Sequence, residues 1–321
     1  MTRVSPAQLL RWHNHVLRSA LNYEPQDLRF GTSGRRGLVI DLTQLEIYIN
    51  VRAELDYLQA LPSSQGGIVA GQEVFVAYDL RPSSTSFVPE QQGRGELAQA
   101  TVQAIVDARM VSVNLGALPT PALTYYALSR GRASIMITGS HIPFDRNGYK
   151  TNTSQGELLK QHEAPIAEAV RKMRERVYSE PLETSHFNEN GDLKRGHSGL
   201  LDENSEARSA YVERYIDFFA GSTLRGKRIV LYEHSAVGRD ILREILAQFG
   251  AEVIPVARSS SFVPIDTENI DAAQLDLIQN LTDSVAASHG PVDAVLSVDG
   301  DSDRPLVLGV VPSTSKVQFF G

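Results

Sequence analysis

Two residues in the first half of the chain are of the types that phosphoryl transfer uses. Ser140 lies in the sequence TGSHIP at residues 138–143, and Lys150 closes the sequence NGYK at residues 147–150. A serine hydroxyl becomes a useful nucleophile when a neighbouring group removes its proton or stabilises its product. A lysine with a shifted pKa can serve as a general acid or base. We expect the Asn-Gly pair at residues 147–148 to form a turn that brings the lysine behind the serine loop.

Three aspartates alternate with small residues in the second half of the chain. Asp299, Asp301 and Asp303 belong to the sequence DGDSDR at residues 299–304. On an extended strand these side chains would be about 6.5–7 Å apart, which is too far for one Mg²⁺ with ligands about 2.0–2.1 Å from the ion. We therefore expect the segment to curl. Clustered carboxylates repel one another unless a cation neutralises them, so the pattern predicts a Mg²⁺ site.

Each motif also has a simpler interpretation when taken alone. The aspartates could form a solvated acidic turn, whereas an EF-hand calcium loop is disfavoured because Val310 stands where its glutamate would be. The serine does not form the nucleophile elbow of hydrolases, since Ile142 replaces the required glycine. On an extended chain the side chain of His141 would point away from Ser140. We expect His141 to shape the loop rather than to act as the direct base.

A glycine-rich sequence near the start of the chain is suited to holding a phosphate. It reads GTSGRRG at residues 31–37 and offers the backbone N–H groups around Thr32 and Ser33 together with the Arg36 guanidinium. It lacks the Gly-Lys-Ser/Thr ending of a nucleotide-binding P-loop. The sequence HSAVGR at residues 234–239 is either a second anion cradle or a plain turn.

Composition places the chain among globular proteins and excludes several kinds of site. Of 321 residues, 42% are hydrophobic and 21% charged, and the net charge of −7 argues against nucleic acid as a partner. The absence of cysteine excludes thiolate metal sites and cysteine nucleophiles. No apolar run reaches the roughly 18 residues of a membrane span. Residues 1–23 carry three arginines and no acid, which predicts a packed amphipathic helix or, alternatively, an organelle-targeting segment; we expect a cytoplasmic protein.

Hydrophobic periodicity predicts an α/β protein with two tandem domains, each with a mixed or mostly parallel sheet and helices on both faces. The predicted strands are residues 74–78, 111–113, 134–138, 228–232, 252–256 and 293–298. The predicted helices are residues 95–110, 122–128, 157–176, 207–219, 238–249 and 272–281. Periodicity is lost over residues 179–206, so we place the domains at 1–185 and 206–321. Ser140 and the aspartates then lie just after the C-terminal ends of strands, which is the edge of an α/β sheet where functional sites are found.

Four of these sequences occur together and in a fixed order: FGTSGRRG at residues 30–37, TGSHIP, NGYK and DGDSDR. In this combination the chain resembles the α-D-phosphohexomutases, the superfamily of phosphoglucomutase, phosphomannomutase and phosphoglucosamine mutase. The resemblance implies a reaction that interconverts a hexose 1-phosphate and a hexose 6-phosphate. It also implies a phosphosugar as substrate, Mg²⁺ as cofactor and a hexose 1,6-bisphosphate as intermediate and activator.

The resemblance also implies roles for individual residues. Ser140 would be the phosphoserine, and one of its phosphoryl oxygens would bind Mg²⁺ together with the three aspartates. Lys150 would be the general acid/base, with His141 beside the serine. The substrate's phosphate would be bound by the residues of the first loop and by the arginine that ends the aspartate sequence: Thr32, Ser33, Arg36 and Arg304.

Two departures from the superfamily pattern shape our expectations. Ile142 replaces an asparagine that is common in the serine loop. The resemblance also covers only the first two of four family domains, with domains 3 and 4 absent from these 321 residues. We therefore expect weak or no turnover and self-association through an exposed edge of domain 2. The alternatives are a non-catalytic remnant that binds Mg²⁺ or a partner and a Mg²⁺-dependent sugar phosphatase.

Overall fold

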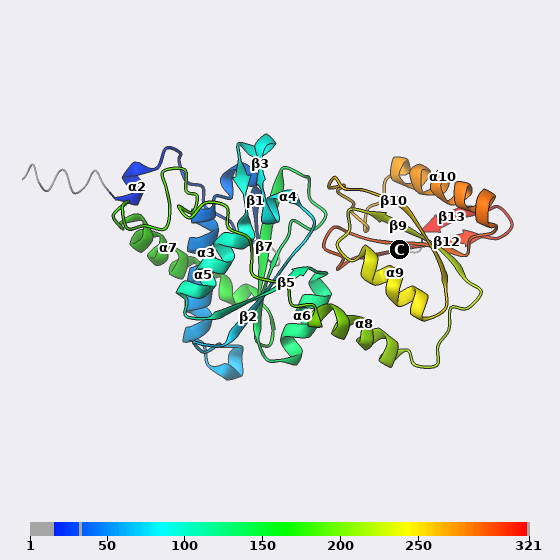
Figure 1. Cartoon of the computed structure of the whole chain (residues 1–321), viewed down its shortest axis with the longest axis horizontal. Helices are drawn as coiled ribbons and strands as arrows, with labels where there is room; N and C mark the ends of the chain where they lie inside the picture. Colours follow the sequence, from blue (N-terminus) through cyan, green and yellow to red (C-terminus); the bar gives the residue numbers. More distant parts are fainter. Residues whose placement is uncertain (1–15, 32–33, 320–321) are drawn as a thin grey trace, which may run out of the picture.

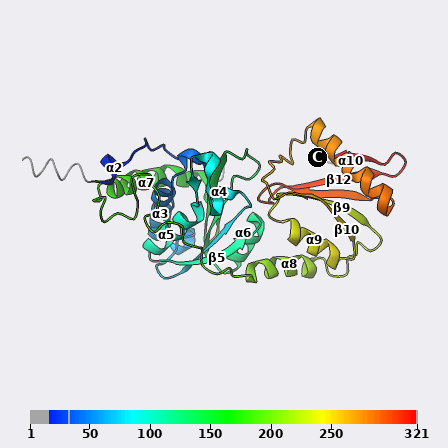
Figure 2. The same ribbon diagram turned by 45° about the horizontal axis from the view of Figure 1, so that its top comes forward.

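The computed structural model describes residues 16–31 and 34–319, and it contains two α/β units side by side (Figures 1 and 2). We call the first unit domain 1 and the second domain 2. Helix α8 (Glu206–Phe218) runs along both of them and packs on α6 (Thr120–Ser129) in domain 1 and on α9 (Arg239–Gln248) in domain 2. The two units are therefore joined by a shared layer of helices as well as by the chain.

The sheet of domain 1 has the strand order β1-β7-β6-β2-β5, with β8 paired to β7. Strand β2 is parallel to β5 and β6, whereas β7 is antiparallel to β6, β1 and β8. The strands are β1 (Arg35–Leu38), β2 (Glu73–Tyr78), β5 (Val111–Ala117), β6 (Ala133–Ile137), β7 (Arg146–Thr153) and β8 (Gly156–Glu157). A separate two-stranded sheet pairs β3 (Phe87–Val88) with β4 (Arg94–Gly95).

Helices cover both faces of this sheet because successive strand residues point to opposite faces. In β2, Val74 and Val76 belong to one core cluster, and Phe75 and Ala77 belong to another. The first cluster lies under α3, α5 and α7, and the second lies under α6 and α8 (Figure 1). The helices of domain 1 are α2 (Leu17–Ala20), α3 (Gln44–Ala60), α4 (Pro82–Thr85), α5 (Leu97–Asp107), α6 and α7 (Glu163–Tyr178), with 3-10 turns at Val39–Asp41, Ser63–Gln65, Pro89–Gln91 and Lys160–His162.

Domain 2 repeats the strand plan of domain 1. Its order is β10-β9-β11-β12-β13; β9 is parallel to β10 and β11, and β12 is antiparallel to β11 and β13. Helices α9 and α10 lie on opposite sides of this sheet (Figure 1). The new elements are β9 (Arg228–His234), β10 (Glu252–Arg258), α10 (Ala272–His289), β11 (Ala294–Val298), β12 (Pro305–Val311) and β13 (Lys316–Phe319).

The α/β class with mixed sheets and helices on both faces is confirmed, as is each predicted strand and helix to within a few residues at its ends, apart from α7 and α10. Helix α7 begins at Glu163 rather than 157, and α10 continues to His289 rather than 281. The predicted turn at residues 147–148 is wrong, because both residues lie inside β7. Most of the predicted N-terminal helix lies outside the described residues. No described helix is long and apolar enough to cross a membrane.

Candidate active site

Ser140 follows β6 in the loop that leads to β7. Its side chain is fully buried, and its φ of 55° lies in the left-handed region. The backbone N–H donates to Thr138 Oγ1 at 2.7 Å, and the hydroxyl donates to Asp299 Oδ2 at 2.7 Å. The hydroxyl thus crosses from one domain to the other, so the structure brings together two residues that lie 159 positions apart in the chain.

The aspartate loop joins β11 to β12 and curls as the sequence indicates. Asp299, Asp301 and Asp303 can place one carboxylate oxygen each within 4.8 Å of one another. The turn is closed by backbone N–H groups of Asp303 and Arg304, which each donate to Asp299 Oδ1 at 3.2 Å. Ser302 has a φ of 62°, so the backbone reverses there. The oxygens are close enough to share one hard cation.

Lys150 contacts the aspartate loop directly. It points from β7 into domain 2, where its Nζ donates to Asp301 Oδ2 at 2.9 Å and to Asp303 Oδ2 at 2.7 Å. Thr120 Oγ1 also donates to Asp301 Oδ2, at 2.7 Å. Burial lowers the pKa of Lys150, but the two carboxylates outweigh burial and raise it above its ordinary value. The ammonium group is therefore charged at neutral pH in this arrangement.

The three carboxylates differ in their electrostatic settings. Burial, together with the charges of Asp301 and Asp303, raises the pKa of Asp299 to about 7. Burial also opposes ionisation of Asp301, but Lys150 and Thr120 outweigh it and lower the pKa of that carboxyl. Asp301 Oδ1 is buried and has no hydrogen-bond partner among the described residues. One ammonium beside three carboxylates leaves excess negative charge, and the unpartnered oxygen gives a cation a ligand, so this donor set fits Mg²⁺.

A buried arginine that the sequence analysis missed holds the serine loop. Arg81 is 1% exposed and donates four hydrogen bonds to loop carbonyls. Its Nη2 binds the carbonyls of Ser140 and Ile142 at 2.9 and 2.5 Å, and its Nη1 binds those of Pro143 and Arg146 at 2.7 and 2.8 Å. The guanidinium has a planar, fixed set of donors, so these four contacts define the path of the loop.

Asp79 completes this support at the end of β2. Its carboxylate lies 3.3 Å from Arg81 Nε and accepts the Thr138 hydroxyl at 2.8 Å and the Ser84 hydroxyl at 3.0 Å. The sequence does contain a signal for this pair. An acid and an arginine two positions apart follow a buried strand directly, at the same sheet edge as Ser140.

A second buried network explains the direction of Lys150. Glu54 of α3 accepts hydrogen bonds from Arg35, Tyr149 and Thr151 at 2.8, 3.0 and 2.7 Å. Tyr149 and Thr151 are the chain neighbours of Lys150, and alternate strand residues point to opposite faces. Anchoring both neighbours toward α3 therefore directs Lys150 toward the site.

His141 and Arg304 border this centre. The prediction that the His141 side chain points away from Ser140 is wrong: its Nδ1 lies 3.4 Å from Ser140 Oγ, because the left-handed backbone at Ser140 breaks the extended alternation. Burial, followed by the Arg304 charge, lowers the pKa of His141. Arg304 pairs with Glu268 at 3.1 Å and with Asp266 at 3.5 Å.

The first loop is only partly described. Arg36 is half-buried on β1, opposite Gly148 of β7, which places it near the strand that carries Lys150. Its charge contributes to lowering the pKa values of His141 and Arg81, after burial in both cases. Thr32 and Ser33 lie outside the described residues. Apart from Thr32 and Ser33, the predicted site residues thus lie on or near the serine loop and the aspartate loop.

The sequence HSAVGR supports neighbouring loops with its side chains. His234 Nε2 donates to the carbonyl of Val298, the residue before Asp299, at 2.7 Å. Arg239 Nη1 donates to the carbonyls of His234 and Ser259 at 2.6 and 2.9 Å. Nη1 of this guanidinium is occupied by backbone carbonyls, which favours the interpretation of this sequence as a plain turn over that of an anion cradle.

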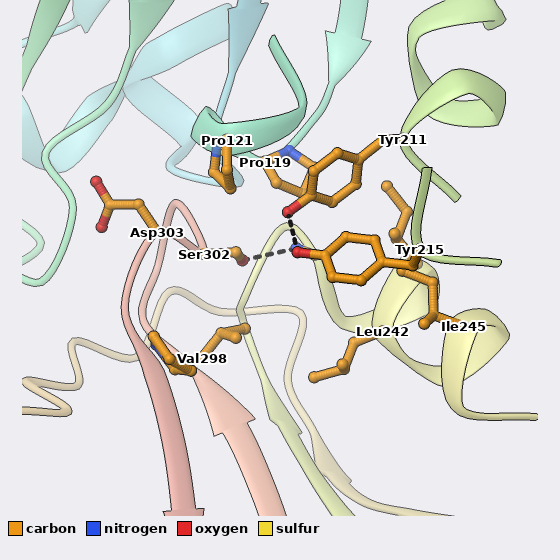
Figure 3. A pocket seen from close by; sticks show the side chains of 12 residues that line it. Pro119, Pro121, Tyr211, Tyr215, Leu242, Ile245, Val298, Ser302 and Asp303 are labelled. Atoms are coloured by element: carbon orange, nitrogen blue, oxygen red, sulfur yellow. Dashed lines mark hydrogen bonds between the residues drawn. The ribbon is translucent and has the colours of Figure 1, made fainter. Parts of the chain in front are cut away.

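A small cavity of about 260 Å³ lies beside the aspartate loop, between α8, α9 and the start of α6 (Figure 3). Its walls are mainly apolar, and Tyr211 and Tyr215 hydrogen-bond to each other across 3.0 Å. Ser302 reaches the cavity, whereas the carboxylate of Asp303 points away from it (Figure 3). Asp303 is the only residue of the carboxylate cluster that lines this cavity among the described residues, so the cluster lies beside the cavity rather than in it.

Comparisons with known proteins find matches to both domains. The family model "Phosphoglucomutase/phosphomannomutase, alpha/beta/alpha domain I" matches residues 27–177, and the model for domain II matches residues 209–310. A phosphomannomutase of Sinorhizobium fredii is 38% identical over 279 residues, which are 87% of this chain and 52% of that protein. A phosphomannomutase of Salmonella muenchen is 34% identical over 280 residues, 87% of this chain and 50% of that protein.

A solved structure supports the fold. It is a phosphoglucomutase/phosphomannomutase family protein from Burkholderia thailandensis, with a TM-score of 0.61 and 20% identity over 89% of this chain and 55% of that one. The chain spans about half the length of the curated relatives it matches.

Proposed function

This chain belongs to the phosphoglucomutase/phosphomannomutase family of isomerases, and on that premise we propose that it carries the phosphoryl-transfer centre of a phosphohexomutase. The proposed reaction interconverts a hexose 1-phosphate and a hexose 6-phosphate through a 1,6-bisphosphate. The observation that carries the proposal is the 2.7 Å hydrogen bond from Ser140 to Asp299. It places a buried hydroxyl against a cluster of carboxylates that fits a divalent cation.

Ser140 is the proposed carrier of the phosphoryl group. In one direction the bond between phosphorus and the serine oxygen breaks and a new bond forms from phosphorus to a sugar hydroxyl oxygen; that hydroxyl gives up its proton and the serine oxygen takes one up. In the return step the serine oxygen gives up its proton and attacks the other phosphate of the bisphosphate, whose bond to the sugar breaks, and the departing sugar oxygen takes up a proton. The buried setting supports this role, since the loop is held by Arg81 and a fixed nucleophile removes part of the entropic barrier.

Lys150 and His141 are the proposed proton-handling groups. Lys150 is charged here and can donate a proton to an oxygen that leaves phosphorus. His141, whose pKa is lowered by burial, is the neutral group beside the serine oxygen. Arg36, Arg304, Thr32 and Ser33 are proposed to bind the phosphates of the substrate, where guanidinium and backbone N–H groups are suitable donors.

Mg²⁺ is the proposed cofactor. Asp299, Asp301 and Asp303 would hold it, together with an oxygen of phosphorylated Ser140. When bound, the ion would neutralise charge on the transferring phosphoryl group. The unpartnered Oδ1 of Asp301 and the excess of carboxylates support this assignment.

We further propose that these 321 residues alone turn over free hexose phosphates weakly. The centre described above handles the reacting phosphate, and orientation of the rest of the substrate can contribute about 7–11 kcal/mol to a reaction barrier. Apolar side chains on β12 and β13 favour self-association: Val307 is 46% exposed and Phe319 is 41% exposed.

The test is phosphorylation of Ser140 itself. The chain is incubated with glucose 1,6-bisphosphate and Mg²⁺ and examined by intact mass and peptide mapping. We expect one phosphoryl group on Ser140, none on Ser140→Ala, and wild-type labelling of the matched control Ser129→Ala, which alters an exposed serine. Phosphate on another residue, or labelling that persists in Ser140→Ala, would refute the proposal.

A further inference from the structure

The guanidinium of Arg81 is covered by a residue of the other domain. The Phe262 ring lies over it, with 3.9 Å from Arg81 Cζ to the ring centroid. Phe262 belongs to the segment between β10 and α10 of domain 2 and is itself buried, at 8% exposed. A desolvated cation over an aromatic face is worth about 2 kcal/mol or more. The group that holds the serine loop is thus stabilised from across the domain boundary.

The same ring also touches the aspartate loop. A Cβ added at Gly300 would lie 3.2 Å from two atoms of the Phe262 ring and 2.6 Å from the carbonyl oxygen of Ser140. Gly300 is therefore in close contact with both. The ring is therefore in contact with Arg81, which supports the serine loop, and with Gly300 of the aspartate loop.

Phe262 is held in this place by its own domain. The neighbouring N–H of Val263 donates to Ser235 Oγ at 2.8 Å. Further along the same segment, Thr267 Oγ1 donates to the carbonyl of Arg304 at 3.3 Å. Although buried, Phe262 belongs to none of the three core clusters that the described residues form. The ring instead lies against Arg81 of domain 1 and Gly300 of the aspartate loop.

We propose that Phe262 is a positioning residue for phosphoryl transfer to Ser140. Its aromatic face keeps Arg81 in the orientation that binds the four loop carbonyls, and its edge keeps Gly300 against the Ser140 carbonyl. The serine loop therefore takes its working geometry only when domain 2 is docked. This inference rests on the proposed function for its kinetic consequence, but the positioning itself is a property of the loop that can be measured without catalysis.

The proposal is tested with Phe262→Leu, Phe262→Tyr and Phe262→Trp, which separate apolar volume from an aromatic face. Phe187→Leu is the matched control, because Phe187 is a buried phenylalanine of the domain 1 core. Two quantities are measured for each protein: the rate of Ser140 phosphorylation by glucose 1,6-bisphosphate with Mg²⁺, and hydrogen exchange of the peptide that covers residues 139–146.

We expect Phe262→Leu to slow phosphorylation about 10- to 30-fold, which corresponds to the loss of one desolvated cation–π contact. Exchange over residues 139–146 should rise by a similar factor while β2 and β6 stay protected. Phe262→Tyr and Phe262→Trp should restore both quantities, and Phe187→Leu should change neither. Equal effects in Phe262→Leu and Phe187→Leu, or no rescue by the aromatic variants, would overturn the proposal.

Two further outcomes remain decisive. If the wild-type chain is not phosphorylated, the proposed function fails, and hydrogen exchange alone still decides whether Phe262 orders the loop. If Phe262→Leu does not fold, Arg81→Lys replaces it, because lysine keeps the charge but cannot bind four carbonyls in a planar fork. Arg81→Lys should raise exchange over residues 139–146, and unchanged exchange would contradict the proposal.

Discussion

The serine loop and the aspartate loop occupy the same position in two sheets of the same design, but they are held in different ways. In each domain the loop follows the third of the parallel strands in chain order and leads into an antiparallel strand. The neighbouring parallel strand supplies the support in both. In domain 1 that support is the ion pair of Asp79 and Arg81. In domain 2 it is the imidazole of His234.

The chemistry of each loop explains the difference. The serine loop turns four carbonyls to one side, and a buried guanidinium can bind all four. In the proposed function the aspartate loop leaves its carboxylates available for a cation, and an arginine beneath the loop would pair with them. Burial lowers the pKa of His234 to about 4, so this support is uncharged at neutral pH. The order of the strands therefore decides where a loop lies, and the charge of the loop decides which kind of side chain supports it.

The largest expected effect comes from removing the charged support. Arg81→Ala leaves Asp79 buried without its partner and four carbonyls without donors, so we expect a loss of about 3–5 kcal/mol in the free energy of unfolding. Urea denaturation measures this loss. Arg171→Ala is the control, because its ion pairs on α7 are exposed, and surface pairs contribute about 0–1 kcal/mol. Similar losses of unfolding free energy in both variants would contradict the conclusion that a buried charged group supports the serine loop.

The second expected effect concerns the cation. Asp301→Asn removes a negative charge and one carboxylate oxygen from the donor set while it keeps the size of the side chain. We expect Mg²⁺ affinity to fall by at least about 100-fold, since loss of outer-shell partners alone costs about 10–100-fold. Calorimetry measures the affinity, and the melting temperature checks the fold. The control Asp217→Asn, which alters an exposed aspartate of α8, should bind Mg²⁺ as the wild type does. Unchanged Mg²⁺ affinity in Asp301→Asn would exclude Asp301 as a ligand.

The smallest expected effect comes from the neutral support. The folded-state pKa of His234 is about 4, below the ordinary value of 6.5, so its stabilising contribution is complete above pH 6.5 and is lost as the pH falls toward 4. We expect about 2 kcal/mol of unfolding free energy to be lost between pH 7.5 and pH 5 through this group. His234→Gln should weaken the pH dependence of the unfolding free energy, which is measured by urea denaturation. His289→Gln, on the exposed end of α10, should leave the pH dependence of the unfolding free energy unchanged. Identical pH profiles for the two variants would argue against an uncharged His234 as the support of the aspartate loop.

Much of this arrangement follows from sequence patterns, for identifiable reasons. The buried strands that precede Ser140 and Asp299 are short apolar runs, and the C-terminal edge of a parallel sheet brings such loops together. Helix α3 escaped prediction because it buries polar residues, among them Glu46, Asn50 and Glu54, which interrupt its apolar pattern. These residues are tolerated because partners from distant segments bind them, as Arg35 binds Glu54.

The Asn-Gly pair in β7 departs from its usual pattern for a similar reason. It is typical of a turn, but here Asn147 donates to Ser83 and Ser84 at 2.8 and 3.1 Å, and a Cβ at Gly148 would lie 2.0 Å from the carbonyl oxygen of Arg35. Glycine is required by a neighbouring strand rather than by a turn. The roles of Arg81 and Phe262 likewise depend on contacts between segments that periodicity cannot place.

The separation of Ser140 from Asp299 has a consequence for the timing of synthesis. When the serine is incorporated into the growing chain, 159 residues are still to be added before its hydrogen-bond partner exists. At roughly 5–20 residues per second, that interval lasts about 8–32 s. Domain 1 can begin to fold during this time, because its sheet is complete once β8 has been made. The phosphorylation that we propose for Ser140 would therefore have to wait until the second domain has emerged and docked.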